Sequence, residues 1–275
     1  MTRRTVARTA ELSGAGLHTG SACRVSLAPA AAGTGIVFMH EGQPIPARLA
    51  QVVATERRTA LHAGSHRVET VEHLLAAVHA VGIDDLMVNV DGPELPILDG
   101  SFAPFLALIE EAGAAGQAGA VRIAMLAHPL EVMEGEASYR VEPAEEYTVE
   151  VALEYREPVI GRQRHRCTVT EQSFRTEIAK ARTFGFLADI GALQARGLLG
   201  GATADCAVVL SEEAVLNTTL HWPDEFARHK LGDLIGDLAL LGTRLAVRIE
   251  ATRPSHSGNI ACARAIAAAA RYLEA

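Results

Sequence analysis

Apolar and polar residues alternate with a period of two through roughly the first 70 residues, in short runs separated by glycine, proline and charged positions. This period is typical of half-buried β-strands, so the pattern predicts a β-rich beginning. The predicted strands cover residues 5–12, 22–27, 35–39, 47–53, 59–62 and 66–68. A glycine-rich loop at 13–20 separates the first two strands. Because no helical pattern follows this loop, it does not predict a phosphate-binding loop.

The pattern then changes to helical spacing. Apolar residues at positions 71, 74, 75, 78 and 81 predict a helix that Thr70 caps and Gly82 ends. A strand at 86–90, a proline-rich turn and a helix at 102–112, capped by Ser101, are predicted next. The segment 113–119 consists mostly of glycine and alanine and is predicted to be a domain linker.

The second half of the chain repeats this order of strands followed by helices. Its predicted strands cover residues 122–125, 130–133, 138–141, 147–155 and 165–169, and a helix–turn–strand segment spans 175–209. A helix through 228–238 has apolar residues at 231, 234, 235, 238 and 241, and it ends at Gly242. A strand at 245–250 and an alanine-rich helix at 259–273 follow.

Both halves therefore close with a helix, a glycine, an alternating strand, a turn and a second helix. Aligning Gly82 with Gly242 places His73 and Asp233 each nine residues before the glycine. This echo predicts an α+β fold of two similar layered domains, each a mostly antiparallel sheet packed on helices in a βααβ-type order. The predicted domains are residues 1–118 and 119–275, with a functional site between the equivalent helices.

The composition limits the class of protein. The chain has 275 residues, 49% hydrophobic and 21% charged, which is typical of a globular protein of two domains. Its net charge of −8 argues against nucleic-acid binding. The start lacks the apolar run of a signal peptide, and the sequence has no apolar stretch long enough to span a membrane. The four scattered cysteines indicate reduced, buried thiols, and we expect a cytoplasmic protein.

The helix at 228–238 carries a row of polar residues beside its apolar stripe. His229, Asp233 and Asp237 follow at i, i+4 and i+8, so one imidazole and two carboxylates share a face. Gly232 and Gly236 repeat at the same spacing, which indicates that something approaches the backbone closely. A neutral imidazole and a carboxylate four residues apart can bind zinc, or equally iron(II). The alternative is a solvated amphipathic face with a His–Asp ion pair.

The echo between the halves makes His73 the natural third ligand. Two histidines and one aspartate leave a fourth position for water, which is the arrangement of a catalytic zinc site. Glu72 would lie beside that water and could act as its general base. The alternatives are an exposed histidine in a first helical turn for His73 and a helix-dipole partner for Glu72.

Three further segments carry candidate chemistry. His256 lies in a polar turn before the last helix and is either a proton donor or a surface residue; Asp237 could hydrogen-bond it and keep it protonated. Thr183 could present its hydroxyl to the site or cap a helix. The leucine- and isoleucine-rich segment after Phe186, interrupted by glycines, is either an ordinary core helix or the wall of a site for an apolar ligand.

Five segments, in the same order along the chain, resemble those of the UDP-3-O-acyl-N-acetylglucosamine deacetylase family of lipid A biosynthesis. The resemblance extends in order over nearly the whole chain. The segments are residues 14–20, 70–74, 95–101, 181–186 and 228–238.

The resemblance implies roles for individual residues. The zinc ligands would be His73, His229 and Asp233. The general base would be Glu72, and the cationic histidine would be His256, supported by Asp237. Substrate contacts would come from Thr183 at the oxyanion, Lys230 at the phosphates, Tyr155 at the uracil ring, and Phe184, Leu187, Ile190 and Gly201 at an acyl-chain passage built by an insert around residues 187–205. The family usually has glycine where this chain has Ser255, directly before the cationic histidine.

The implied function is zinc-dependent hydrolysis of the N-acetyl group of UDP-3-O-(3-hydroxyacyl)-N-acetylglucosamine, with release of acetate. The alternatives are a non-catalytic relative that binds zinc or a nucleotide sugar, and a deacetylase of a different acyl-sugar. We expect a monomer that binds a UDP-linked acylated glucosamine and no nucleic acid. We also expect no transmembrane segment, and peripheral contact with the inner membrane.

Overall fold

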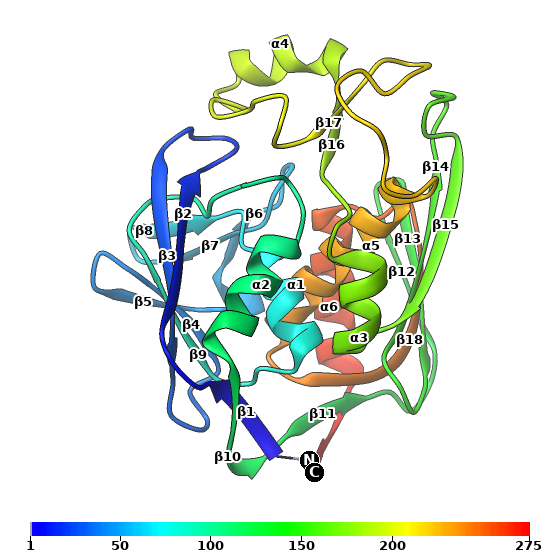
Figure 1. The fold of residues 1–275 in the computed structure, drawn as a ribbon. Helices are drawn as coiled ribbons and strands as arrows, with labels where there is room; N and C mark the ends of the chain where they lie inside the picture. Colours follow the sequence, from blue (N-terminus) through cyan, green and yellow to red (C-terminus); the bar gives the residue numbers. More distant parts are fainter. Residues whose placement is uncertain (1) are drawn as a thin grey trace.

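Two groups of strands enclose a layer of helices in the computed structural model, which describes residues 2–275 (Figure 1). The first half of the chain supplies the sheet on one side and the second half the sheet on the other. Helices α1, α2, α5 and α6 lie between them. The predicted α+β class, with mostly antiparallel sheets packed on helices, is confirmed.

The helical segments are α1 (Glu72–Val81), α2 (Ala103–Ala112), α3 (Glu171–Ser173), α4 (Leu187–Ala195), α5 (Glu225–Leu238) and α6 (His256–Ala269), together with the non-α helical turns η1 (Leu49–Gln51), η2 (Phe174–Ile178) and η3 (Ala239–Leu241). No helix within residues 2–275 has the length and apolar character needed to cross a bilayer.

The first half builds a five-stranded sheet in the order β2-β3-β9-β4-β5 and a three-stranded sheet in the order β6-β7-β8. Its strands are β1 (Thr2–Val6), β2 (Ala10–Ala15), β3 (Ala22–Pro29), β4 (Ile36–His40), β5 (Gln43–Pro46), β6 (Val52–Ala54), β7 (Ala60–Ala63), β8 (His66–Glu69) and β9 (Leu86–Val90). The single strand predicted at 5–12 is wrong, because an exposed turn at residues 7–9 divides it into β1 and β2.

The second half builds a seven-stranded sheet around β18, which pairs with β11, β13 and β14. Its strands are β11 (Arg122–Met125), β12 (Leu130–Glu134), β13 (Ala137–Pro143), β14 (Thr148–Glu154), β15 (Arg162–Thr168), β18 (Arg244–Thr252) and β19 (Arg271–Glu274). Two short parallel strands, β16 (Phe184–Phe186) and β17 (Val208–Leu210), flank α4 and carry it away from the rest of the molecule, at the top of Figure 1.

Several local predictions were wrong for physical reasons. The segment predicted as a linker is strand β10 (Ala114–Ala120), because its backbone pairs with β1. Thr70 does not cap α1; it has a positive φ of 58° and its hydroxyl donates to Glu94. The last helix begins earlier and ends earlier than predicted, since the C-terminal residues form β19 against β11. The domain boundary after residue 118 stays a prediction.

The order of elements that the two halves share in sequence is also present in the structure. Gly82 ends α1 and Gly242 ends η3, each in the left-handed conformation, with φ of 76° and 65°. Glycine adopts this conformation without the steric cost that a Cβ imposes. A strand follows each glycine, β9 in one half and β18 in the other. The equivalent helices α1 and α5 pack against each other in the centre of the molecule.

Candidate active site

Two glycines let α5 pack closely on its neighbours: Gly236 faces the start of α1, and Gly232 faces Phe102, which precedes α2. A Cβ added at Gly236 would lie 2.1 Å from the carbonyl oxygen of Glu72. One added at Gly232 would lie 2.3 Å from the ring of Phe102. Both positions are too tight for any larger residue, so the predicted close approach to the backbone is confirmed. Its consequence is that side chains near the start of α1 face those in the middle of α5.

Three potential metal ligands meet at this contact. One ligand atom from each of His73, His229 and Asp233 lies within 4.8 Å of the others, and all three residues are buried. Asp233 Oδ1 is 3.7 Å from His73 Nε2 and 3.4 Å from His229 Nε2. The Nδ1 of His229 lies 3.1 Å from the carbonyl oxygen of Ala181, to which it must donate, so Nε2 carries the lone pair.

The protonation states of these residues fit a divalent cation. Burial, followed by the neighbouring His229, lowers the pKa of His73 to about 3, and burial also lowers the pKa of His229. Burial acts to raise the pKa of Asp233, but His229 and Lys230 outweigh it and lower that pKa. Two neutral imidazoles and an ionised carboxylate are the forms that bind metal. Asp233 Oδ1 is buried with no hydrogen-bond partner in the described chain, which a metal ion would provide.

Glu72 lies next to this cluster at the start of α1. Its Oε2 accepts a hydrogen bond of 3.0 Å from the backbone N–H of Thr59, and its Oε1 is 4.0 Å from His256 Nε2. Burial raises the pKa of Glu72 to about 7. A carboxyl group with a pKa near neutrality can accept a proton and release it again at physiological pH.

His256 is held on the other side of the cluster by Asp237. Its Nδ1 donates to Asp237 Oδ2 at 2.8 Å, and Asn259 donates to the same oxygen at 2.8 Å. The hydroxyl of Thr59 donates to Asp237 Oδ1 at 2.5 Å. Burial acts to lower the pKa of His256, but the charge and hydrogen bond of Asp237 outweigh it and raise that pKa to about 9. The imidazole is therefore a cation at neutral pH, and it is not a surface residue.

Ser255 stands where the resemblance implied a glycine, and it does not turn the ring of His256 away from Asp237. Ser255 has φ of −135° and ψ of 159°, an extended conformation open to any residue, and it is the N-cap of α6. Its Oγ accepts a hydrogen bond of 3.1 Å from the N–H of Gly258. The serine thereby fixes the first turn of α6, which begins with His256.

Two residues of this network were missed from the sequence. Thr59 bridges Glu72 and Asp237, although it lies directly before β7 with no motif around it. Asn259 lies three residues after His256 on the same helix, so the helical spacing within residues 255–259 could have indicated it.

A cavity of about 240 Å³ opens directly above the cluster. Its lining includes four residues that were predicted to contact the substrate or the oxyanion: Tyr155, Thr183, Phe184 and Lys230. Thr183 is not a helix cap, since Phe186 precedes the first residue of α4. The ammonium of Lys230 donates to Asp233 Oδ2 at 2.7 Å. Their contacts with substrate stay a prediction.

A second, larger cavity of about 430 Å³ continues from the first toward α4. It is lined mainly by apolar side chains, including Leu187 and Ile190, and it shares Thr183 and Phe184 with the first cavity. Gly201 is not among its lining residues. A Cβ there would lie 2.1 Å from the carbonyl oxygen of Gly16, so Gly201 instead joins the insert to the loop of the first half.

The sequence profile described as UDP-3-O-acyl N-acetylglycosamine deacetylase matches residues 3–268. The chain is 42% identical to the UDP-3-O-acyl-N-acetylglucosamine deacetylase of Anaeromyxobacter sp. (strain Fw109-5), over 97% of this chain and 88% of that protein. The protein of the same name from Thermosynechococcus vestitus is 43% identical, over 97% and 94% of the two chains. That from Chlamydia trachomatis serovar D is 38% identical, over 98% and 96%. The chain therefore belongs to the UDP-3-O-acyl N-acetylglycosamine deacetylase family.

Proposed function

We propose that this chain hydrolyses the N-acetyl group of UDP-3-O-(3-hydroxyacyl)-N-acetylglucosamine and releases acetate, as a zinc metalloamidase of lipid A biosynthesis. Family membership gives the reaction and substrate class. The observation that carries the proposal is the buried cluster of His73, His229 and Asp233 with a carboxyl group of near-neutral pKa on one side and a charged imidazole on the other.

The metal itself is proposed from ligand chemistry. Two imidazole nitrogens and one carboxylate oxygen suit zinc, and iron(II) could occupy the same ligands. When bound there, zinc would polarise the amide carbonyl and lower the pKa of a coordinated water toward ~7. The chain supplies the remaining chemistry.

Glu72 accepts the proton of the attacking water. Its hydrogen bond from the backbone of Thr59 fixes the carboxylate, and burial makes it basic enough for this role. His256 faces the same point with its Nε2, while its Nδ1 is occupied by Asp237. The charged imidazole therefore donates a proton to the leaving amine and balances negative charge during attack. Thr183, at the junction of the two cavities, donates to the oxyanion.

The two cavities divide substrate recognition between polar and apolar groups. Lys230 and Tyr155 line the first cavity, where they would contact the phosphates and the uracil ring. Phe184 lies at the junction, and Leu187 and Ile190 line the apolar cavity that would hold the acyl chain. Each CH₂ group buried there adds ~0.8 kcal/mol of binding free energy. The cytoplasmic location, monomeric state and membrane contact remain predictions.

One experiment separates the proposal from its alternatives. Metal content of the purified protein is measured, together with acetate release from the UDP substrate before and after chelation and after addition of Zn²⁺ or Fe²⁺. We expect near-stoichiometric metal, loss of acetate release on chelation and recovery on addition of metal. A non-catalytic relative would bind metal and release no acetate from any acyl-sugar. A deacetylase of another acyl-sugar would bind metal and release acetate from that sugar but not from the UDP substrate. Activity that persists in metal-free protein would contradict the assignment.

A further inference from the structure

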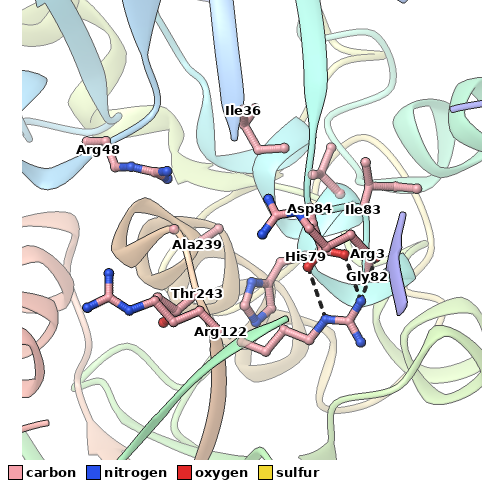
Figure 2. A pocket seen from close by; sticks show the side chains of 13 residues that line it. Arg3, Ile36, Arg48, His79, Gly82, Ile83, Asp84, Arg122, Ala239 and Thr243 are labelled. Atoms are coloured by element: carbon pink, nitrogen blue, oxygen red, sulfur yellow. Dashed lines mark hydrogen bonds and ion pairs between the residues drawn. The ribbon is translucent and has the colours of Figure 1, made fainter. Parts of the chain in front are cut away.

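A second polar pocket is lined by residues of β1 and of the segments in which α1 and η3 end. In Figure 1, β1 and both chain termini lie at the end of the molecule opposite α4. Figure 2 shows its lining, which contains arginine side chains from several separate segments, together with His79 and Thr243. The arginines are Arg3, Arg48, Arg122 and Arg244. Such a gathering of cations is notable in a chain whose net charge is −8.

The carboxylates beside this pocket are already occupied. Arg3 forms a two-point ion pair with Asp85, at 2.7 and 2.8 Å, and Asp85 also accepts from the N–H of Gly35 and from Gln117. Arg244 pairs with Asp84 at 2.9 and 3.2 Å. These bonds use both oxygens of each carboxylate, so neither acid forms an ion pair with a further guanidinium, and the charge of Asp85 offsets only part of what lowers the pKa of Arg48.

Arg48 and Arg122 remain without a carboxylate partner within residues 2–275. Arg48 is partly buried, and its one side-chain hydrogen bond there is a long contact of 3.4 Å with the carbonyl oxygen of Ala47. Arg122 stacks on the ring of Tyr272 at 3.7 Å. Burial, with the positive charges of Arg3 and Arg122, lowers the pKa of Arg48. Holding the guanidinium of Arg48 here therefore costs free energy that a bound anion would offset.

Thr243 supplies an independent sign of a missing partner. It lines the same pocket, and its Oγ1 is buried with no hydrogen-bond partner in the described part of the chain. Buried hydroxyl groups in proteins are nearly always hydrogen-bonded, and an unpaired one is unfavourable. An oxyanion would accept from this hydroxyl as well as from the guanidinium groups.

The size of the pocket restricts the ligand. The space that the centre of a water molecule can reach is about 50 Å³, and a single water requires ~10–15 Å³ of such space. The space suits a few waters or one small oxyanion, and excludes a nucleotide or a sugar. We propose that the pocket binds a single phosphate group, held by Arg48 and Arg122 and by the hydroxyl of Thr243.

Binding there would join the two halves of the chain. Arg48 belongs to the first half, whereas Arg122 and Thr243 belong to the second. The pocket lies at the C-terminal ends of α1 and η3, whereas the metal cluster lies at the start of α1 and in the middle of α5, the helix that η3 follows. The site is a ligand-binding site separate from the active site, and it does not depend on the proposed deacetylation.

The melting temperature of the whole chain, measured in phosphate and in chloride of matched ionic strength, tests the proposal. A ligand that binds only the folded state raises the melting temperature, and at about 100 times its Kd the rise should be a few degrees. We expect this rise with phosphate and not with chloride. Equal effects of the two salts would overturn the proposal.

Two variants and one control place the effect at this pocket. Arg48→Gln should abolish the phosphate-dependent rise. Thr243→Val, which removes only an unpaired hydroxyl and keeps the shape, should weaken that rise while leaving the melting temperature in chloride unchanged or higher. Arg166→Gln, at an exposed position on β15, should respond to phosphate like the parent. An unchanged rise in Arg48→Gln would mean that phosphate binds elsewhere, at the metal cluster for example, and would contradict the assignment.

A second arm distinguishes the source of the phosphate group. Glycerol 3-phosphate replaces inorganic phosphate in the same measurement. A rise of similar size that Arg48→Gln abolishes would assign the pocket to the terminal phosphate of a larger molecule. A rise with inorganic phosphate alone would assign it to the free ion. No rise with either ligand would refute the site.

Discussion

The metal cluster and the α4 insert contribute to one proposed active site, but they are built in opposite ways. His73 and His229 are each 3% exposed and Asp233 is 2% exposed, on helices packed in the centre of the molecule. In α4 only Leu193 is buried, and Leu187 is 55% exposed. The groups proposed to do chemistry are thus fixed by packing, whereas α4, which forms one side of the apolar cavity, is largely exposed to solvent.

The attachment of each region differs as well. Hydrogen bonds between buried groups fix Glu72 and His256 through Thr59 and Asp237. By contrast, α4 is tied to the first half by exposed ion pairs, Arg57 with Asp189 at 3.4 Å and Arg196 with Glu56. Exposed pairs contribute little free energy. We therefore expect variants in the cluster to remove activity on all substrates, and variants near α4 to change which substrates are preferred.

The largest effect should follow removal of a metal ligand. Asp233→Ala deletes one of three protein ligands, so we expect substoichiometric metal and loss of measurable acetate release. Because it also leaves Lys230 without its buried partner, Asp233→Asn is needed as a shape-conserving variant. Asp205→Ala, at an exposed position, is the control. Stoichiometric metal in both Asp233 variants would remove this residue from the ligand set.

Removal of the general base should separate metal binding from turnover. Glu72→Gln keeps the side-chain shape and the acceptor for the Thr59 N–H but cannot take a proton. We expect kcat to fall by about 10²–10⁴ with metal content unchanged. Near-normal kcat in metal-loaded Glu72→Gln would show that another group removes the proton.

The pH dependence should report Glu72 and His256 in turn. Activity should rise as Glu72 loses its proton near its pKa of about 7 and fall as His256 loses its proton near its pKa of about 9. Asp237→Asn removes the charge that raises the pKa of His256, so the falling limb should move to lower pH. A falling limb that does not move would mean that it reports a different group.

The same substitution should change stability with a defined sign. The pKa of His256 is raised in the folded state above its ordinary value of 6.5. Its charged form therefore contributes stability that is fully present below about pH 6.5 and is lost as the pH rises through about 9. Unfolding of metal-free parent and Asp237→Asn protein between these pH values should show a dependence that is weaker in the variant.

A smaller and selective effect is expected at the apolar cavity. Ala207 lines this cavity, and Ala207→Leu fills part of it. We expect kcat/KM to fall for long acyl chains, by up to about tenfold for each two CH₂ groups that lose their burial, and to change little for short-chain analogues. Gly201→Leu is the contrast, because its side chain would meet the backbone of Gly16. This variant should destabilise the protein and therefore reduce activity on every substrate alike. An equal loss on all chain lengths for Ala207→Leu would mean that the cavity does not hold the chain.

The smallest effect should come from the exposed ion pairs of α4. Arg196→Ala removes the pair with Glu56, and both side chains are more than half exposed. The free energy of unfolding should change by less than ~1 kcal/mol. Chemical denaturation measures this change. A loss of several kcal/mol would show that α4 is packed as firmly as the cluster and would remove the contrast between the two regions.

Much of the fold followed from periodicity. Strand β9 and strand β11 have the predicted bounds, and the apolar stripes of α1 and α5 are buried as expected. The errors lie where pairing partners are distant in sequence. Strand β10 has a glycine–alanine sequence without strand character, and it is a strand because β1 offers its backbone hydrogen bonds. The bond from Thr70 to Glu94 likewise spans a contact that local patterns cannot specify.

The sequence by itself determined the residue types and spacings of the site. The i, i+4 and i+8 row on α5, the two glycines beside it and the echo that singled out His73 are properties of helical geometry, which local sequence specifies. Only the tertiary structure decided the rest. Packing of α1, α5 and α6 places Glu72 beside His256, and Thr59 joins Glu72 to Asp237, which holds His256. Arg48, just before η1, and Arg122, in β11, line one pocket although they come from different halves of the chain. These contacts, and the pKa values that follow from burial, depend on how distant segments exclude water from one another, and a one-dimensional pattern does not encode that exclusion.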